Sequence, residues 1–187
     1  MSKEEFLKKY NLEEITEEEN FILDIKYATS NNFIGKILYD EPMCMLRKNT
    51  KEKLKGVNKE LNDMGYKLKI WDAFRPLEYQ KYMWELFPDE RFVTNPDKGN
   101  SNHTKGSAVD VTICTLDGEE ISMPTKFDHF GEESFRNNYD LCDKETKSNV
   151  LFLENIMSRY GFIPFETEWW HFNDCDDYDM IKELYEH

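Results

Sequence analysis

The sequence has no long apolar run and no excess of positive charge. None of its 187 residues belongs to a stretch approaching the roughly 18 apolar residues that a membrane-spanning helix needs, so we expect no membrane insertion. The first residues, MSKEEF, contain neither an apolar segment nor a small-residue cleavage site, which predicts a cytoplasmic location. Lysine and arginine number 24 against 38 aspartates and glutamates, a net charge of −14, and such a surface disfavours nucleic-acid partners.

Cysteine is scarce, and several catalytic motifs are missing. The four cysteines form no CxxC pair, so we expect free thiols and neither a disulfide framework nor a four-cysteine zinc site. The HExxH motif is absent, which excludes the zinc peptidases that carry both histidine ligands on one helix. GxSxG and a phosphate-binding glycine loop are absent as well.

Hydrophobic periodicity predicts a small α+β protein. Apolar residues make up 39% of the chain and aromatic residues 14%, enough for one compact core. Alternation and three- to four-residue spacing predict strands at 21–27, 66–70, 106–114 and 162–172, and helices between Thr50 and Gly65, at 77–87 and at 144–160. These elements show no βαβ rhythm, so we expect a single domain over residues 1–187 with a central, mainly antiparallel sheet flanked by helices.

A carboxylate interrupts one of these apolar strands. Asp110 stands within AVDVTI, where a buried carboxylate is costly without a cation. Seven residues earlier, His103 ends a long polar loop, and this spacing lets its imidazole fold back over the strand. In the alternative interpretation, Asp110 pairs with an arginine or caps a backbone group while His103 faces solvent.

A second polar cluster lies between aromatic residues near the end of the chain. Glu168 and His171 belong to the segment EWWH, whereas His129 and His187 have no such setting and are predicted to be surface residues. Together with His103 and Asp110, His171 gives a set of two imidazoles and one carboxylate. This set satisfies the three protein ligands of a catalytic zinc ion, which keeps a fourth position open for water.

Glu168 is then the candidate general base, although its spacing raises a geometric problem. Three residues before His171 on an extended strand, its side chain points to the opposite face, so we expect a bulge or an irregular strand. Glu166 is the competing base and has the same difficulty. Arg75, which ends a strand and precedes Pro76, is a candidate for stabilising an oxyanion, and its alternative role is a structural salt bridge.

These residues resemble the D-Ala-D-Ala dipeptidases related to the enzyme of vancomycin-resistance clusters, within the wider group of D,D-carboxypeptidases. The resemblance covers most of the chain and rests on DIKYAT at 24–29, NFxGK at 32–36, WDAFRP at 71–76, SxHxxGxAxDxT at 101–112, MPxxFD at 123–128 and EWWH at 168–171. The order SxHx₆D followed by ExxH is a specific signature, whereas each piece alone is weak.

The resemblance implies a zinc-dependent dipeptidase with one Zn²⁺ ion per chain and a small D,D-dipeptide as its substrate. It implies that the ion is held by His103, Asp110 and His171. Glu168 is then the base and Arg75 the stabiliser of the transition state. The resemblance further implies a pocket lined by Tyr27, Tyr39, Ser101 and Asp128. In this pocket, Asp128 is a counter-ion for the substrate ammonium, and hydroxyl groups hold the carboxylate.

Other functions stay open at this stage. The stretch between Pro76 and Ser101 is shorter than in the resistance enzyme, so a more open lid would admit longer peptidoglycan peptides, as in a D,D-carboxypeptidase. A non-catalytic zinc-binding module is a second alternative. A non-haem iron(II) oxygenase is a third, although those sites usually separate the first histidine and the carboxylate by one residue.

Overall fold

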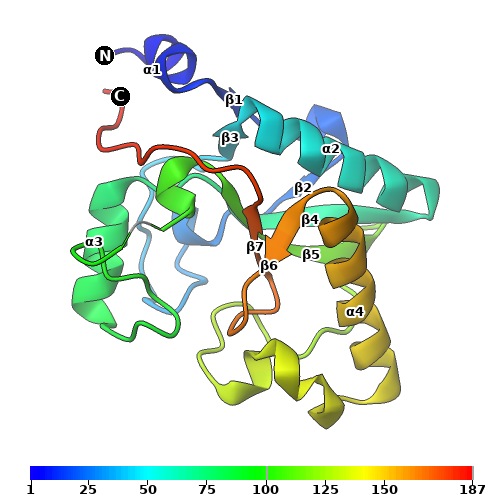
Figure 1. Ribbon diagram of the computed structural model, residues 1–187. Helices are drawn as coiled ribbons and strands as arrows, with labels where there is room; N and C mark the ends of the chain where they lie inside the picture. The colour runs from blue at the N-terminus through cyan, green and yellow to red at the C-terminus, as the bar shows by residue number, and fades with distance from the viewer. Residues whose placement is uncertain (100, 187) are drawn as a thin grey trace.

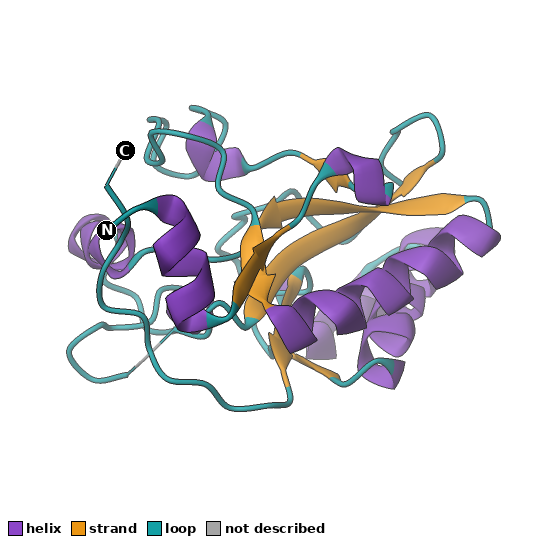
Figure 2. Cartoon of the chain, turned by 90° about the horizontal axis from the view of Figure 1, so that it is seen from above, coloured by secondary structure: helices purple, strands orange, loops and turns teal. Residues whose placement is uncertain are grey.

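The computed structural model describes residues 1–99 and 101–186 as an α+β fold around a five-stranded sheet (Figure 1 and Figure 2). The strands lie in the order β2 (Ile22–Leu23), β4 (Tyr66–Asp72), β5 (Ala108–Thr115), β7 (His171–Asp174) and β6 (Phe162–Pro164). β2 is parallel to β4, and the other neighbouring strands are antiparallel. The predicted fold class is confirmed.

Two long helices, α2 (Lys48–Asp63) and α4 (Lys144–Arg159), cover one face of the sheet, as Figure 2 shows. Their apolar residues recur at helical spacing and are fully buried, among them Leu54 and Val57 of α2 and Leu153 of α4. A third helix, α3 (Leu77–Leu86), lies beyond one end of the sheet, and α1 (Lys3–Tyr10) lies near both termini (Figure 1). The strands β1 (Leu12–Glu14) and β3 (Met45–Arg47) form a separate antiparallel pair.

The two faces of β5 carry different side chains. Val109, Val111 and Ile113 belong to the main apolar core, together with residues of α2 and α4. Asp110 and Thr112 alternate with them and therefore point to the opposite face, which loops cover. The sheet thus has one face for the core and one face for polar chemistry.

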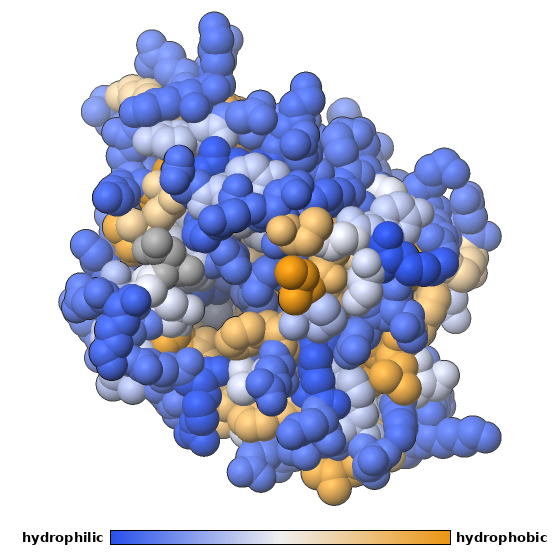
Figure 3. Space-filling model, in the orientation of Figure 1, coloured by the Kyte–Doolittle hydropathy of each residue, from blue (hydrophilic) through white to orange (hydrophobic). Residues whose placement is uncertain are grey.

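The face of the molecule that Figure 3 shows is mostly hydrophilic. Figure 3 shows one face of the molecule on which polar side chains predominate and apolar ones form only small patches. The net charge of −14 accords with this surface. Within the described part of the chain, no helix is both long and apolar enough to cross a bilayer.

The predicted strand at 21–27 is mostly wrong. Only Ile22–Leu23 pairs with β4, and Lys26–Ala28 forms a 3-10 turn. The reason is that the carbonyl oxygen of Tyr27 accepts hydrogen bonds from the backbone of Leu38 and Tyr39, so the chain leaves the sheet there.

The predicted strand at 162–172 is also wrong as a single element. It consists of two antiparallel strands, β6 and β7, joined by residues 165–170. The backbone N–H of Phe165 donates to the carbonyl oxygen of His171 at 3.1 Å, which closes this connection.

Helix boundaries agree with prediction except at one start. α2 begins at Lys48, and Thr50 lies inside the helix, where its hydroxyl donates to the carboxylate of Asp174 and therefore does not act as an N-cap. Gly65 follows the helix with φ of 85°, as a C-terminal glycine should. Helix α1 was not predicted, although Ser2 and Glu5 form a capping box that signals its start.

Candidate metal centre and active site

Two of the three predicted ligands are opposite residues on adjacent strands. Asp110 of β5 pairs with His171 of β7 in the antiparallel register, which places their side chains on one face with Cβ atoms roughly 4.5–5.5 Å apart. His103 begins a 3-10 turn, His103–Lys105, just before β5. Gly106, with φ of 71°, turns the chain from this segment into the strand. The loop imidazole therefore folds back over the strand as its spacing predicts.

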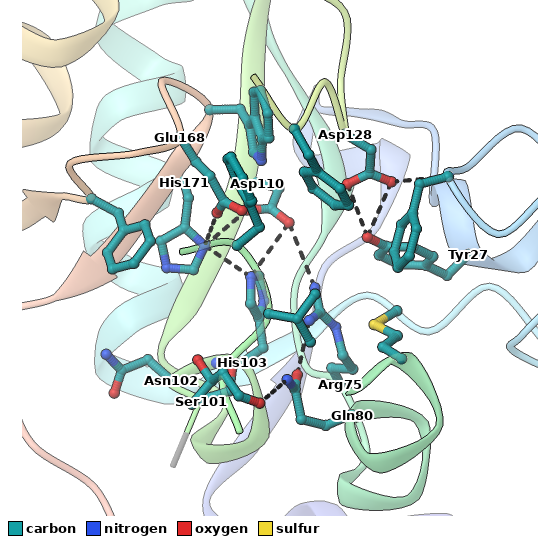
Figure 4. Close-up of a pocket in the computed structure, with 18 of the residues that line it drawn as sticks. Tyr27, Arg75, Gln80, Ser101, Asn102, His103, Asp110, Asp128, Glu168 and His171 are labelled. Carbon is teal, nitrogen blue, oxygen red and sulfur yellow. Dashed lines mark hydrogen bonds and ion pairs between the residues drawn. The ribbon is translucent and has the colours of Figure 1, made fainter. Parts of the chain in front are cut away.

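The ligand atoms of these residues converge closely in Figure 4. Nε2 of His103 lies 3.1 Å from Nδ1 of His171, which lies 3.0 Å from Oδ1 of Asp110. Oδ2 of Asp110 lies 3.3 Å from Nε2 of His103. Ligands bound at about 2.0–2.1 Å to a tetrahedral zinc ion lie about 3.3 Å from one another, which is close to these separations.

The outer hydrogen bond of each imidazole determines where its proton lies. Nδ1 of His103 is 2.6 Å from the carbonyl oxygen of Ala73, so Nδ1 donates and Nε2 carries a lone pair. Nε2 of His171 is 2.8 Å from Oδ1 of Asn173, which leaves the lone pair on Nδ1. With the Asp110 carboxylate, three lone-pair donors thus face one another in a buried site. Such an arrangement is costly without a cation, so these residues fit a divalent metal ion such as zinc.

Glu168 lies beside this centre because it belongs to a turn and not to a strand. The backbone N–H of His171 donates to the carbonyl oxygen of Glu168 at 3.2 Å, and Oε2 of Glu168 is 3.7 Å from Nδ1 of His171. Glu168 is 7% exposed, whereas the competing candidate Glu166 is exposed to solvent. Burial, together with the carboxylates of Asp110 and Asp128, raises the pKa of Glu168 well above its ordinary value.

Arg136 holds the connection that carries Glu168. Its Nη2 donates to the carbonyl oxygens of Glu168, Trp169 and His171 at 3.0–3.1 Å. Its Nε donates to the carbonyl oxygen of Phe165, so one guanidinium ties both ends of the turn together. Sequence reasoning missed Arg136 because it lies in an irregular segment with no motif around it.

Arg75 is buried and fixed by neighbours on three sides. Its Nε and Nη2 donate to Oδ2 of Asp72 at 2.9 and 2.7 Å, and its Nη1 donates to Oε1 of Gln80 at 2.9 Å. Nη2 also lies 3.8 Å from Oδ2 of Asp110. Burial alone would lower the pKa of Arg75, but Asp72 and the other nearby acidic groups raise it well above its ordinary value. The guanidinium therefore stays charged beside the metal centre.

The candidate ligands and catalytic residues line one cavity of about 170 Å³, together with Tyr27, Ser101 and Asp128 (Figure 4). The hydroxyl of Tyr27 donates to both carboxylate oxygens of Asp128, at 3.1 and 3.2 Å. Burial and then the charge of Asp110 raise the pKa of Asp128 to about 8. A carboxylate in this position is suited to a cationic group, which would compensate its buried charge.

Tyr39 is placed differently from the other predicted pocket residues. It is not among the described residues that line the cavity. Its hydroxyl donates to Oδ1 of Asp72 at 2.9 Å, so it contacts the carboxylate that binds Arg75. Asp72 and Gln80, which no sequence rule singled out, thus connect Tyr39 and α3 to the guanidinium.

Aromatic side chains surround the mouth of the cavity. The ring of Phe130 lies 4.9 Å from those of Phe33, Phe87 and Phe92, of which the last two belong to the same connection after α3. Three of these rings, those of Phe33, Phe92 and Phe130, line the cavity itself. These rings form the apolar part of a cavity wall that is otherwise polar.

The remaining histidines lie outside this site. His129 is exposed, and its Nε2 is 3.1 Å from a carboxylate oxygen of Glu133. His187, predicted to be a surface residue, lies outside the described residues. A second group of potential ligands, Asp174, Cys175 and Asp176, already surrounds the ammonium of Lys53, which is 2.5 Å from Asp174 and 2.7 Å from Asp176.

Comparisons with known proteins point to one family. A family model described as D-ala-D-ala dipeptidase matches residues 7–187. The D-alanyl-D-alanine dipeptidase of Escherichia coli is 33% identical over 150 residues, which are 80% of this chain and 77% of that protein. The enzyme of the same name from Enterococcus faecalis is 29% identical over 174 residues, 82% of this chain and 86% of its own length.

A solved structure of VanYB in complex with D-alanine-D-alanine aligns with a TM-score of 0.46 and 16% identity over 71% of this chain and 72% of that chain. The match over residues 7–187 is decisive, and the chain belongs to the D-Ala-D-Ala dipeptidase family of metal-dependent hydrolases.

Proposed function

We propose that the protein is a zinc peptidase that hydrolyses the dipeptide D-Ala-D-Ala to D-alanine. The observation that carries this proposal is the convergence of three buried lone-pair donors, His103, Asp110 and His171, in the same small cavity as Glu168 and Arg75. The names of the relatives support the choice of substrate.

His103, Asp110 and His171 are the residues that would hold the metal ion. A bound zinc ion supplies a water molecule with a pKa lowered to about 7 and polarises a carbonyl group as a Lewis acid. The second hydrogen bonds to Ala73 and Asn173 keep each imidazole in the tautomer that presents its lone pair.

Glu168 is proposed as the general base. Its Oε2 lies on the cavity side of the turn, 3.7 Å from Nδ1 of His171. There it accepts the proton of the attacking water and later passes it to the nitrogen of the leaving D-alanine. The exposed Glu166 has no comparable position.

Arg75 is proposed to stabilise the oxyanion that develops on the scissile carbonyl. Because Asp72 and Gln80 already fix the guanidinium, it needs no reorganisation when the charge appears. We assign Tyr39 an indirect part, which is to orient Asp72 through its hydroxyl.

The two charged ends of the substrate require separate partners. We propose that Asp128, held by Tyr27, binds the ammonium group, and that Ser101 binds the carboxylate. The cavity of about 170 Å³ corresponds to about six water molecules at ~30 Å³ each, which favours a very small substrate.

The test is to incubate the protein with zinc and D-Ala-D-Ala and to measure free D-alanine. Release of D-alanine that EDTA abolishes would support the proposal, and zinc binding without release would favour the non-catalytic module. A peptidoglycan pentapeptide assayed in parallel separates the dipeptidase from a D,D-carboxypeptidase, because only the latter cleaves the longer substrate efficiently.

A further inference from the structure

The three candidate metal ligands are fixed to the fold in two different ways. Asp110 and His171 lie on paired strands, where the hydrogen bonds of the sheet hold their backbone. His103 instead begins the 3-10 turn His103–Lys105, and the hydrogen bonds within such short turns have poorer geometry. The position of its imidazole therefore depends also on the groups that bind the turn from outside.

Arg47, the last residue of β3, binds the end of this turn at two points. Its backbone N–H donates to the carbonyl oxygen of Gly106 and its Nε to that of Lys105, each at 2.8 Å. Its Nη1 donates to the carbonyl oxygen of Tyr10 at the end of α1, and its Nη2 donates to that of Asp179 at 2.8 Å. Arg47 is only 9% exposed. One buried guanidinium thus connects the turn that carries His103 with segments from both ends of the chain.

The C-terminal segment, residues 175–186, runs from β7 past the same turn toward α1 (Figure 1). The backbone N–H of Ile181 donates to the carbonyl oxygen of Thr104 at 3.0 Å. The side chain of Ile181 is fully buried, and Tyr185 packs against Phe6 of α1 with ring centroids 5.3 Å apart. These two side chains anchor the C-terminal segment, so its contact with the turn is a fixed part of the fold.

We propose that Arg47 is a positioning residue for the metal ligand His103 and that it acts together with the C-terminal segment. The inference rests on the proposed function, in which His103 binds the ion. Arg47 is not among the described residues that line the catalytic cavity, so it acts through the turn and not on the substrate. The hydrogen bond from Nδ1 to Ala73 orients the ring of His103, whereas Arg47 holds the backbone that carries this ring.

This role predicts an effect on metal affinity. Without Arg47 the turn samples more conformations, and only those that keep Nε2 of His103 beside Asp110 and His171 bind the ion. The apparent affinity falls in proportion to the fraction of molecules in the binding-competent conformation. Because the three ligands themselves are unaltered, saturating zinc restores the site.

The arrangement also requires an arginine. The carbonyl oxygens of Tyr10, Lys105 and Asp179 surround one planar guanidinium, whose nitrogens donate in fixed and different directions. A lysine ammonium is a point charge at the end of a flexible chain and cannot bind all three segments together. A positive charge at position 47 is therefore not sufficient.

The first experiment measures the zinc Kd of the full-length variants Arg47→Ala and Arg47→Lys by competition with a chelator. We expect the Kd of both to rise at least about tenfold, because the loss of an outer partner of a metal ligand commonly costs 10- to 100-fold in affinity. At saturating zinc, most of the release of D-alanine should return. A normal Kd in either variant would overturn the proposal.

Two control variants separate positioning from a general loss of stability. Lys105→Ala removes an ion pair with the exposed Asp177 and keeps the carbonyl group that Arg47 binds, so its zinc Kd should be normal. Leu153→Ala leaves a cavity under α4 and lowers the melting temperature, but it should also leave the Kd unchanged. If Leu153→Ala raised the Kd as much as Arg47→Ala, Arg47 would act only through the stability of the fold, and the proposal would be wrong.

Hydrogen exchange tests the part of the C-terminal segment, because coupling between two binding events is reciprocal. If docking of this segment strengthens zinc binding, zinc strengthens its docking by the same factor. Zinc should therefore slow the exchange of the Ile181 amide, which donates to the turn, while the Lys147 amide at the start of α4 exchanges at an unchanged rate. Equal slowing of both amides, or no slowing of Ile181, would refute the coupling.

Failure of the proposed function and failure of this inference give different results. If the unaltered protein binds no zinc, or binds zinc and releases no D-alanine, the proposed function is wrong. If it binds zinc and cleaves the dipeptide while the Arg47 variants bind zinc equally well, Arg47 does not position His103. Should the Arg47 variants fail to fold, Ile181→Ala loosens the same turn from the C-terminal side and is expected to raise the zinc Kd likewise, whereas an unchanged Kd would contradict the inference.

Discussion

At the scale of single residues, hydrogen bonds made on the side away from the cavity orient the reactive groups. Ala73 and Asn173 fix the two imidazoles, and Asp72 with Gln80 fixes Arg75. Glu168 differs, because no side chain or backbone group among the described residues donates a hydrogen bond to its carboxylate, which lies beside the candidate metal centre. It is therefore the group best placed to exchange a proton.

We expect Glu168→Gln to lower kcat by at least about 10²-fold, because general base catalysis commonly contributes 10²–10⁴. Its zinc content should stay near one ion per chain, since the three ligands are untouched. Metal analysis and D-alanine release measure the two quantities. Glu166→Gln is the matched control, because this neighbouring glutamate is exposed, and it should retain normal turnover. Comparable activity in both variants would remove Glu168 from the mechanism.

The sequence identified the reactive residues better than the residues that hold them in position. Asp110 was recognisable because a carboxylate in an apolar strand needs a partner, and His103 and His171 because they accompany a matching motif. Asp72 and Gln80 lie only three and five residues from Arg75, but no sequence pattern shows that both side chains turn toward its guanidinium. Arg136 was not recognisable because its contacts join segments far apart in the chain. Arg136, for example, binds carbonyl oxygens 32 to 35 residues away.

At the scale of elements, the connection between β6 and β7 solves the geometric problem of Glu168. A continuous strand would point Glu168 and His171 to opposite faces, but the turn at 165–170 places both beside the cavity. Helices such as α4 were predicted well because their period and caps are local. This turn was not predicted, because aromatic residues favour strands on both of its sides and the contacts of Arg136 that hold the reversal come from a distant segment.

We expect Arg136→Ala to lower kcat at least tenfold and the free energy of unfolding by about 2 kcal/mol or more, because several buried carbonyl oxygens lose a charged donor. Chemical denaturation and steady-state kinetics measure the two effects. Arg91→Ala is the control, since Arg91 is exposed and its side chain contacts its near neighbours Asp89 and Phe92. A folded Arg136→Ala with normal kcat would contradict the role given to the turn.

The N-terminus of α4 provides a prediction of how the stability of the fold depends on pH. The backbone N–H of Thr146 donates to Oδ1 of Asp143 at 2.9 Å and lowers the pKa of this carboxyl group. A lowered folded-state pKa means that the stabilisation is present above the unfolded value of about 3.9 and is lost as the pH falls below it. The Asp143→Ala variant should therefore have a lower melting temperature than the unaltered protein at pH 7. The difference in melting temperature should be smaller at pH 3.

Asp143→Asn is the comparison for this measurement. It keeps an oxygen acceptor for the helix terminus without a titratable charge, so most of the melting temperature should be retained. If Asp143→Ala lowers the melting temperature equally at both pH values, the carboxylate charge does not contribute to the stability of the helix terminus.

At the scale of the whole molecule, the candidate metal centre joins distant parts of the chain. The main apolar core extends from Phe6 to Tyr185, and on this ground we propose that residues 1–187 form one domain. The three candidate ligands come from a loop, the central strand and a late strand of that domain. A bound ion therefore stabilises the complete fold and not one element.

We expect zinc to raise the melting temperature of EDTA-treated protein by about 5–10 °C at a hundredfold excess over Kd, where ligand binding contributes about 2.7 kcal/mol. Differential scanning calorimetry measures the shift. His103→Ala should lose most of it, whereas His129→Ala should keep it because His129 is exposed outside the site. An undiminished shift in His103→Ala would place the stabilising ion elsewhere.

Under the proposed function, the pairing of Asp110 with His171 also makes the bound ion a reporter of correct strand alignment. If β7 slipped by one residue along β5, Phe172 would stand opposite Asp110 and every side chain of the late strand would change face. A molecule with that error has lost one imidazole from the cluster and cannot capture the metal. The fraction of recombinant chains that retain zinc after dialysis therefore counts the chains whose strands are correctly aligned, before any assay of activity.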